Sequence, residues 1–95
     1  MEESVKKIEA AIEAVLFSMG EAVEAKELAK VLELDEKTLT KILSDMEIRY
    51  DEEDRGIRLV KLEGAYQLCT KNEYYDILSK IVNMPKKQQR RWLPP

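Results

Sequence analysis

The stretch RGIRLVKLEGAYQLCTK, residues 55–71, predicts a compact β-hairpin. Two runs rich in Ile, Leu, Val and Tyr, at residues 57–62 and 65–70, flank a central Glu63-Gly64 pair. Glycine supplies the positive φ that a tight hairpin turn requires, so the turn is expected at this pair. Apolar residues occur on both faces of the first run, which predicts either a bulge or a strand that is apolar on both sides.

The residues before the hairpin predict three helices, because their apolar side chains recur at steps of three and four. The predicted helices cover residues 4–18, 25–32 and 36–50. Gly20 fits the position that ends the first helix, and Asp35 is the expected N-cap of the third.

A final helix is expected after the hairpin, over residues 72–83, with Asn72 as its N-cap. Its predicted inner face consists of Tyr74, Ile77, Leu78, Ile81 and Val82. The acidic residues 51–54 are expected to form the loop into the hairpin. Three helices, a two-stranded wing and a C-terminal helix define a winged helix-turn-helix, which is a mostly α fold with a small β-hairpin.

The chain is long enough for one domain, which we assign to residues 1–84. Residues 85–95 are basic, end in two prolines and have no apolar periodicity. Such a composition cannot bury enough apolar surface to fold, so this segment is expected to be a disordered tail or a linker remnant.

The composition argues against an enzyme, and it predicts no cofactor and no bound metal. Histidine is absent, which removes the commonest general base and metal ligand. No glycine-rich phosphate-binding motif is present. Cys69 is the single cysteine, so it is expected to be a small, half-buried strand residue in a protein of the reducing cytoplasm. No membrane-spanning run or secretory signal is expected.

Charge is divided unevenly along the chain. Residues 1–84 carry 12 Lys and Arg against 19 Asp and Glu, a net charge of −7, whereas residues 85–95 carry +4. An acidic body repels phosphate backbones, so the charge argues against specific DNA recognition. The alternative is a winged-helix DNA-binding transcriptional regulator, with Lys37, Thr38 and Lys41 of the third helix contacting a groove.

Spare apolar side chains on a small domain often mark a protein interface. The first helix carries more apolar positions than one face needs, and the first wing strand is apolar on both sides. The candidate interface residues are Phe17, Leu62, Tyr66, Leu68 and Tyr74. Alternatively, these side chains simply complete a small core, because a domain of this size needs every large apolar residue.

Two stretches resemble the segregation and condensation protein B family. IEAVLFSMGE, residues 12–21, resembles the opening motif of that family. RGIRLVKLEGAYQL, residues 55–68, followed by TKNEY, residues 70–74, resembles the wing of its first winged-helix domain. The similarity extends over nearly all of residues 5–83, in the same order and with the same spacing.

The resemblance implies a non-enzymatic subunit of the bacterial complex for chromosome condensation and segregation. Members of the family work with a kleisin subunit and an SMC ATPase at the nucleoid. They contain two winged-helix domains and form homodimers largely through the first, while the second contributes much of the kleisin contact. The resemblance covers the first domain alone, so the chain is expected to be either an excised N-terminal domain or an unusually short protein.

Overall fold

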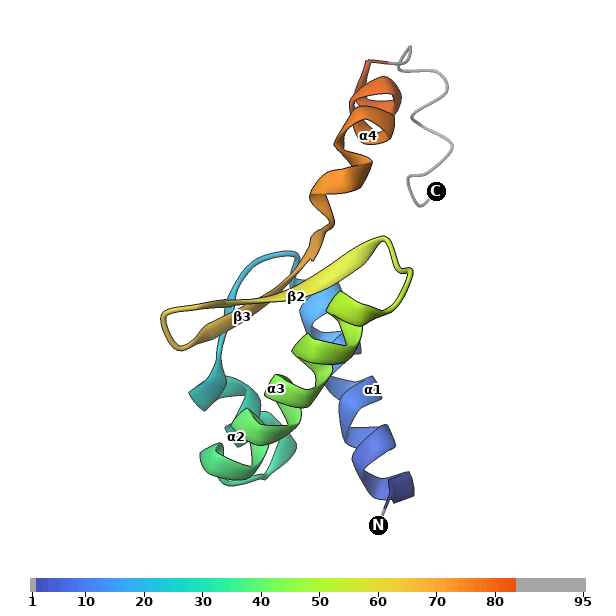
Figure 1. The fold of residues 1–95 in the computed structure, drawn as a ribbon. Helices are drawn as coiled ribbons and strands as arrows, with labels where there is room; N and C mark the ends of the chain where they lie inside the picture. The colour runs from blue at the N-terminus through green and yellow to red at the C-terminus, as the bar shows by residue number, and fades with distance from the viewer. Residues whose placement is uncertain (1, 84–95) are drawn as a thin grey trace, which may run out of the picture.

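The computed structural model describes residues 2–83, and Figure 1 shows their arrangement. In chain order the elements are α1 (Glu2–Met19), β1 (Val23–Glu24), α2 (Ala25–Leu32), α3 (Glu36–Glu52), β2 (Ile57–Leu62), β3 (Ala65–Thr70), the 3-10 helix η1 (Asn72–Tyr74) and α4 (Tyr75–Val82). The predicted order of three helices, a wing and a C-terminal helix is confirmed. The tail predicted over residues 85–95 lies outside the described residues.

The wing hairpin has the predicted bounds, and its turn has a positive φ at both central residues, 41° at Glu63 and 82° at Gly64. This backbone geometry matches the right-handed twist of the flanking strands. Pairing between β2 and β3 runs without interruption from Ile57 opposite Thr70 to Leu62 opposite Ala65, so the hairpin contains no bulge. The alternation of faces along β2 is therefore regular.

The sheet has three strands in the order β1-β3-β2, all antiparallel, rather than the two strands that the sequence predicted. The extra strand is β1, in which Val23 lies opposite Tyr66. The amide of Ala25 donates a hydrogen bond of 2.9 Å to the carbonyl of Gly64, which ties the wing tip to the start of α2. A strand of two residues is too short to produce a periodic pattern, so sequence analysis could not detect it.

The turn between α2 and α3 is fixed by caps on both sides. Helix α2 ends at Glu33, which has a left-handed φ of 56°, and the amide of Leu34 donates to the carbonyl of Ala29. The carboxylate of Asp35 then accepts a hydrogen bond of 3.0 Å from the amide of Thr38, which confirms the predicted N-cap. At its other end α3 continues through Glu52, so the acidic run predicted as a loop is partly helical.

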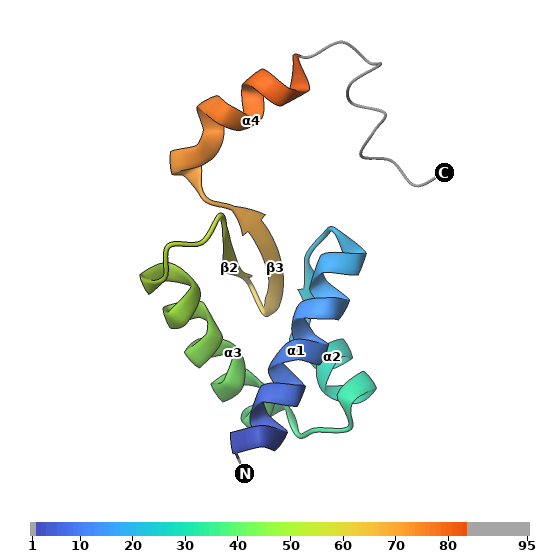
Figure 2. The same cartoon turned by 90° about the vertical axis from the view of Figure 1, so that its right-hand side faces the viewer.

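The core lies between the helices and one face of the sheet. Figure 2 shows the hairpin between α1 and α3, and each helix packs against a strand. The buried apolar residues are Ile12, Leu16, Ala25, Leu28, Ala29, Leu39, Ile42, Leu43, Met46, Tyr50, Leu59 and Tyr66. The core therefore draws on α1, α2, α3 and the wing, and it contains no residue of α4.

Helix α4 corrects the prediction for the C-terminal helix. It stands on the far side of the sheet from α2 and α3, as Figures 1 and 2 both show. The predicted inner face is exposed: Ile77 is 58% exposed and Leu78 38%. Asn72 does not cap the helix, because residues 72–74 form η1 and the side chain of Tyr74 makes no cap hydrogen bond. Apolar periodicity identified the apolar face of α4, but it carried no information on whether another part of the chain covers that face.

Candidate protein interface

Helix α1 presents two different apolar faces. Ile12 and Leu16 point into the core and are buried. Ala10, Ala14 and Phe17 are spaced by four and three residues, so they lie along a second line on the helix, and all three are exposed. Phe17 is the most exposed large apolar residue described, at 78%. A face with two alanines allows another chain segment to approach the helix closely.

This second face of α1 forms one wall of a shallow apolar hollow, which we call the α1–wing hollow. Its volume is about 310 Å³. It is lined by Ala10, Glu13, Ala14, Phe17, Ile57 and Leu68. Glu13 is the one charged residue among these, so the hollow suits an apolar side chain rather than an ion.

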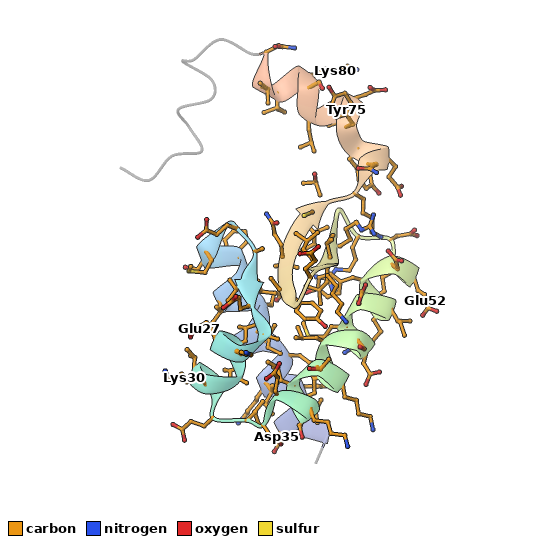
Figure 3. The ribbon with its side chains drawn as sticks, turned by 90° about the vertical axis from the view of Figure 1, so that its left-hand side faces the viewer. Glu27, Lys30, Asp35, Glu52, Tyr75 and Lys80 are labelled. Atoms are coloured by element: carbon orange, nitrogen blue, oxygen red, sulfur yellow. The ribbon has the colours of Figure 1, made fainter. Side chains whose placement is uncertain are left out.

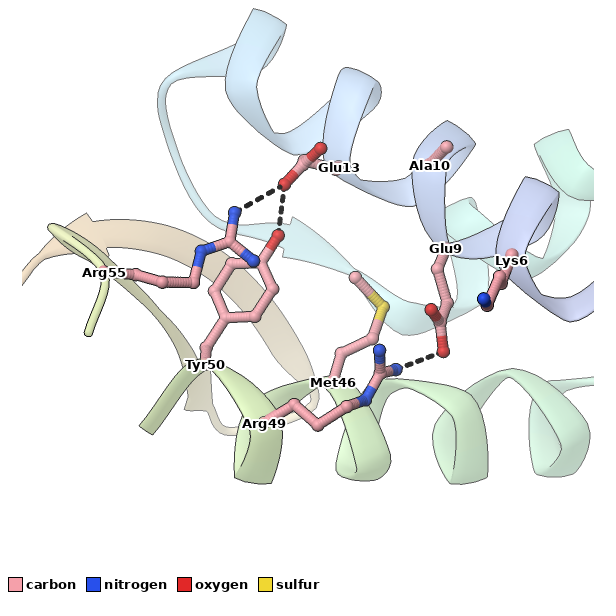
Figure 4. A pocket seen from close by; sticks show the side chains of 8 residues that line it. All are labelled: Lys6, Glu9, Ala10, Glu13, Met46, Arg49, Tyr50 and Arg55. Atoms are coloured by element: carbon pink, nitrogen blue, oxygen red, sulfur yellow. Dashed lines mark hydrogen bonds and ion pairs between the residues drawn. The ribbon is translucent and has the colours of Figure 1, made fainter. Parts of the chain in front are cut away.

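A polar pocket of about 330 Å³ adjoins the hollow and shares Ala10 and Glu13 with it. Figure 4 shows the residues that line this polar pocket. In this pocket Arg49 of α3 forms an ion pair with Glu9 of α1. The hydroxyl of Tyr50 donates a hydrogen bond to the carboxylate of Glu13. These contacts fasten α1 to α3 across the pocket.

Arg55 connects the same cluster to the start of the wing. Its guanidinium lies 4.1 Å from the centre of the Tyr50 ring, and its Nη2 lies 3.4 Å from a carboxylate oxygen of Glu13. Burial, followed by the hydrogen bond to Glu13, raises the pKa of Tyr50 to about 12. The carboxylates of Glu9 and Glu13 both have partners within the chain. The polar pocket is therefore a structural junction that supports the hollow beside it.

The candidate interface residues have different positions in the structure. Phe17 and Leu68, which are distant in sequence, meet at the α1–wing hollow. Leu62 lies beside the wing turn and is 46% exposed, and Tyr74 is half-buried in η1. Tyr66 is 1% exposed and belongs to the core. Its place in the candidate set is a correction: without a bulge, Tyr66 faces the same side as Leu59 and Leu68.

Ala10 and Ala14 belong to the surplus apolar positions that the sequence indicates on the first helix, whereas Ile57 was not predicted as part of this surface. The signal for the two alanines was present, because they fall on the same line of α1 as Phe17. The contribution of Ile57 could not be found in this way, because it depends on how the wing folds back against α1.

A second apolar surface lies on α4. Figure 3 labels Tyr75 and Lys80 on this helix, well away from the other helices. Tyr75 is 70% exposed. A hollow of about 380 Å³ on α4 is lined by Tyr75, Leu78, Ser79, Val82 and Asn83. None of the residues of α4 is buried.

The candidate DNA contacts lie on the first turns of α3, and Lys37, Thr38 and Lys41 are all exposed. The hydroxyl of Thr38 donates to the carboxylate of Asp35 at 2.7 Å, and hydrogen bonds from Thr38 lower the pKa of that carboxylate. A negative charge is thus fixed at the end of the helix that would enter a groove, which weakens the DNA-binding interpretation.

Within residues 2–83 no group of three or more His, Cys, Asp or Glu is placed to hold a metal ion. The described helices include none that is long and apolar enough to cross a membrane. Cys69 is half-buried in β3, as predicted for a structural cysteine.

Comparison with known families identifies proteins that share this winged-helix framework. The model of the segregation and condensation complex subunit ScpB matches residues 10–91. This chain belongs to the ScpB family. Segregation and condensation protein B of Lachnoclostridium phytofermentans is 46% identical over 83 residues, which are 87% of this chain and 44% of that protein. The Bacillus licheniformis protein is 42% identical over 79 residues, 82% of this chain and 40% of that protein. The chain thus spans less than half the length of these ScpB relatives.

Solved ScpB structures share the fold. A crystal structure described as a dimer of the ScpB N-terminal domain complexed with ScpA peptide aligns with a TM-score of 0.77 and 33% identity. The alignment covers 82% of this chain and 98% of that chain. ScpB from Mycobacterium tuberculosis aligns with a TM-score of 0.78 at 20% identity, over 82% of this chain and 49% of that chain. The family resemblance of the sequence and the predicted winged-helix fold are both confirmed.

Proposed function

We propose that this chain is a non-enzymatic protein-interaction module of the bacterial complex for chromosome condensation and segregation. It forms a homodimer, binds a kleisin subunit of the ScpA type, and through that subunit joins an SMC ATPase. The protein then acts in the cytoplasm, at the nucleoid. Membership of the ScpB family and the crystallised dimer of a related N-terminal domain with an ScpA peptide support this proposal.

The observation that carries the proposal is the amount of apolar surface left outside the core. Large apolar side chains are exposed on α1, on the wing and on α4, among them Phe17, Leu62 and Tyr75. Apolar surface in contact with water costs roughly 25 cal/mol per Å², so it favours association with another protein. We propose Phe17, Leu62, Leu68 and Tyr74 as interface residues.

The DNA-binding regulator is the less favoured function. The residues proposed for it, Lys37, Thr38 and Lys41, belong to a segment of net charge −7 over residues 1–84. Phosphate contacts by a few lysines on such a body would be weak and strongly dependent on salt.

Binding to the ScpA-type subunit of the same organism tests the proposal. Titration calorimetry is expected to give a defined stoichiometry, and sedimentation velocity a concentration-dependent dimer. The variant Leu62→Lys is expected to weaken one of these associations. The matched control is Ile48→Lys, because Ile48 is 56% exposed on α3 and lies outside the proposed surface. Equal behaviour of both variants would count against the assignment of Leu62.

Fluorescence anisotropy with duplex DNA tests the alternative. The full chain is compared with a Lys37→Gln/Lys41→Gln variant at low and at physiological salt. Binding that persists at physiological salt and is lost in the variant would establish a DNA reader. Binding that is absent, or that is unchanged in the variant, would exclude the DNA-binding regulator and support the protein-interaction module.

A further inference from the structure

We infer that α4 is an exchange arm: in a dimer, α4 of each copy packs into the α1–wing hollow of the other copy. The inference rests on the proposed homodimer and adds its geometry. It joins the two apolar surfaces of the chain, the face of α4 around Leu78 and the hollow between α1 and the wing, by making each the partner of the other.

Helix α4 is too short to be stable without a partner. The helix has eight residues, none of them buried, and its N-terminus lacks a side-chain cap. Isolated helices shorter than about 12 residues are barely stable in water, because their few hydrogen bonds do not offset the free-energy cost of nucleating the helix. An ordered α4 therefore requires a tertiary contact. Tyr75 and Ile77, which are 70% and 58% exposed, provide the apolar face for it.

The chain leaves the wing in a direction that separates α4 from its own body. After β3, the amide of Lys71 donates to the carbonyl of Gly56 at 2.8 Å, and η1 then leads into α4. In Figures 1 and 2 the helix stands apart from α1 and from the rest of its own body. An arm that leaves its own body with an apolar face is placed to reach a second copy.

The apolar face of α4 and the α1–wing hollow match each other in chemical character. The hollow offers Phe17, Ile57 and Leu68 beside the two alanines, so a helix can lie close against α1. Its charged rim residue, Glu13, is held by Tyr50 and Arg55 of its own chain, so the apolar side chains of the hollow face the arm.

Symmetry and area both favour a second copy as the occupant. A two-fold axis makes every arm contact occur twice, which closes the dimer without leaving an arm unused. Burying two Phe17 and two Tyr75 rings would remove on the order of 500 Å² from water. The rest of both arms and hollows brings the contact toward the roughly 1,200 Å² at which stable interfaces begin. The related N-terminal domain that crystallised as a dimer is covered to 98% by this chain, so its dimer contacts fall in the matched region.

The test uses charge-altered variants of the full chain, with dimerisation measured by sedimentation equilibrium. Phe17→Lys alters the hollow and Leu78→Glu alters the arm. Both side chains are exposed in the single copy, so folding is expected to be retained and is checked by circular dichroism. Each variant alone is expected to raise the dimer dissociation constant at least tenfold. Ile48→Lys, the control on α3, is expected to leave it unchanged.

Mixing the two variants provides the decisive measurement. In an arm exchange, the mixed dimer has two different contacts. In one contact both the arm and the hollow are unaltered, and in the other the introduced glutamate of the arm meets the introduced lysine of the hollow. The mixed dimer is therefore expected to have a dissociation constant at least tenfold lower than that of either variant homodimer. Pairing of α4 with α4 of the other copy would instead leave Phe17→Lys fully dimeric, which would overturn the inference while the homodimer stands. If Phe17→Lys loses binding to the ScpA-type subunit but remains a dimer, the hollow is the binding site for that subunit, and the arm exchange is also overturned. A wild-type chain that stays monomeric would overturn the homodimer itself.

Discussion

The wing and α4 are neighbours in sequence and similarly apolar, yet the fold buries apolar side chains of the wing and leaves those of α4 exposed. Tyr66 of the wing is 1% exposed, whereas Tyr75 of α4 is 70% exposed. One face of the wing is covered by α1 and α3, whereas α4 extends beyond the sheet (Figure 1). The difference teaches that an apolar pattern states which residues avoid water. It does not state whether the cover comes from the same chain or from a partner.

The largest expected effect separates the two tyrosines. Tyr66→Ala removes a fully buried ring from the core and is expected to lower the free energy of unfolding by about 3–5 kcal/mol. Tyr75→Ala is expected to change it by less than about 0.5 kcal/mol when both are measured well below the dimer dissociation constant. Urea denaturation of both variants measures the difference. Similar losses would mean that α4 packs on its own body.

Amide hydrogen exchange sharpens the same comparison. In dilute solution the amides of residues 76–82 are expected to exchange much faster than those of α3, because no buried contact protects α4. At high protein concentration, docking of the arm is expected to slow exchange in α4 at least tenfold and leave α3 unchanged. Exchange in α4 that does not depend on concentration would argue against a partner for the arm.

The polar junction that ties α1 to α3 has a smaller expected effect. Tyr50→Phe removes the hydrogen bond to Glu13 and is expected to cost about 1 kcal/mol at pH 7. The folded-state pKa of Tyr50, about 12, lies above its ordinary value of 10.0, so the folded chain holds this proton more tightly than the unfolded chain. The resulting stability is complete below pH 10 and is lost as the pH rises toward about 12.

Denaturation of the wild type and of Tyr50→Phe across this alkaline range checks the assignment. The stability difference between them is expected to shrink between pH 10 and about 12. The two chains differ only at residue 50, so the comparison isolates the hydroxyl of Tyr50. A difference that stays constant with pH would show that the hydroxyl of Tyr50 does not couple to folding.

The smallest expected effect concerns the N-cap of α3. A side chain caps this helix, whereas no side chain caps α4. Hydrogen bonds from Thr38 hold the pKa of Asp35 below its ordinary value of 3.8. The cap therefore stabilises the folded chain above that pH, and its contribution is lost as the pH falls through the lowered pKa. Asp35→Ala is expected to lower the melting temperature slightly at pH 7 and less at pH 2. An equal decrease at both pH values would contradict a role for the carboxylate charge.

Local physics made much of the fold predictable from the sequence. Gly64 fixed the turn of the wing, and the bounds of both wing strands followed from it. The spacing of apolar residues located α2 and the buried stripe of α3, and Asp35 marked where α3 begins. Each of these features depends on residues within one or two turns of each other, so the signal lies in neighbouring letters of the sequence.

The candidate site was less predictable because it joins distant segments. Phe17 and Leu68 were identified from the sequence, but only the packing of α1 against the wing brings them to one hollow. Tyr66 was misassigned because the face of a strand residue depends on register, and a possible bulge left the register open. The strand β1 was missed because two residues form a strand only when β3 is beside them.

The sequence by itself determined the winged-helix framework, the acidic body and the presence of more apolar surface than one small core uses. The tertiary structure decided where that surface lies. It buried Tyr66, opened the hollow beside Phe17 and directed α4 away from the body. The physical reason is that burial is a property of the whole packing arrangement, whereas periodicity and capping are properties of a few adjacent residues.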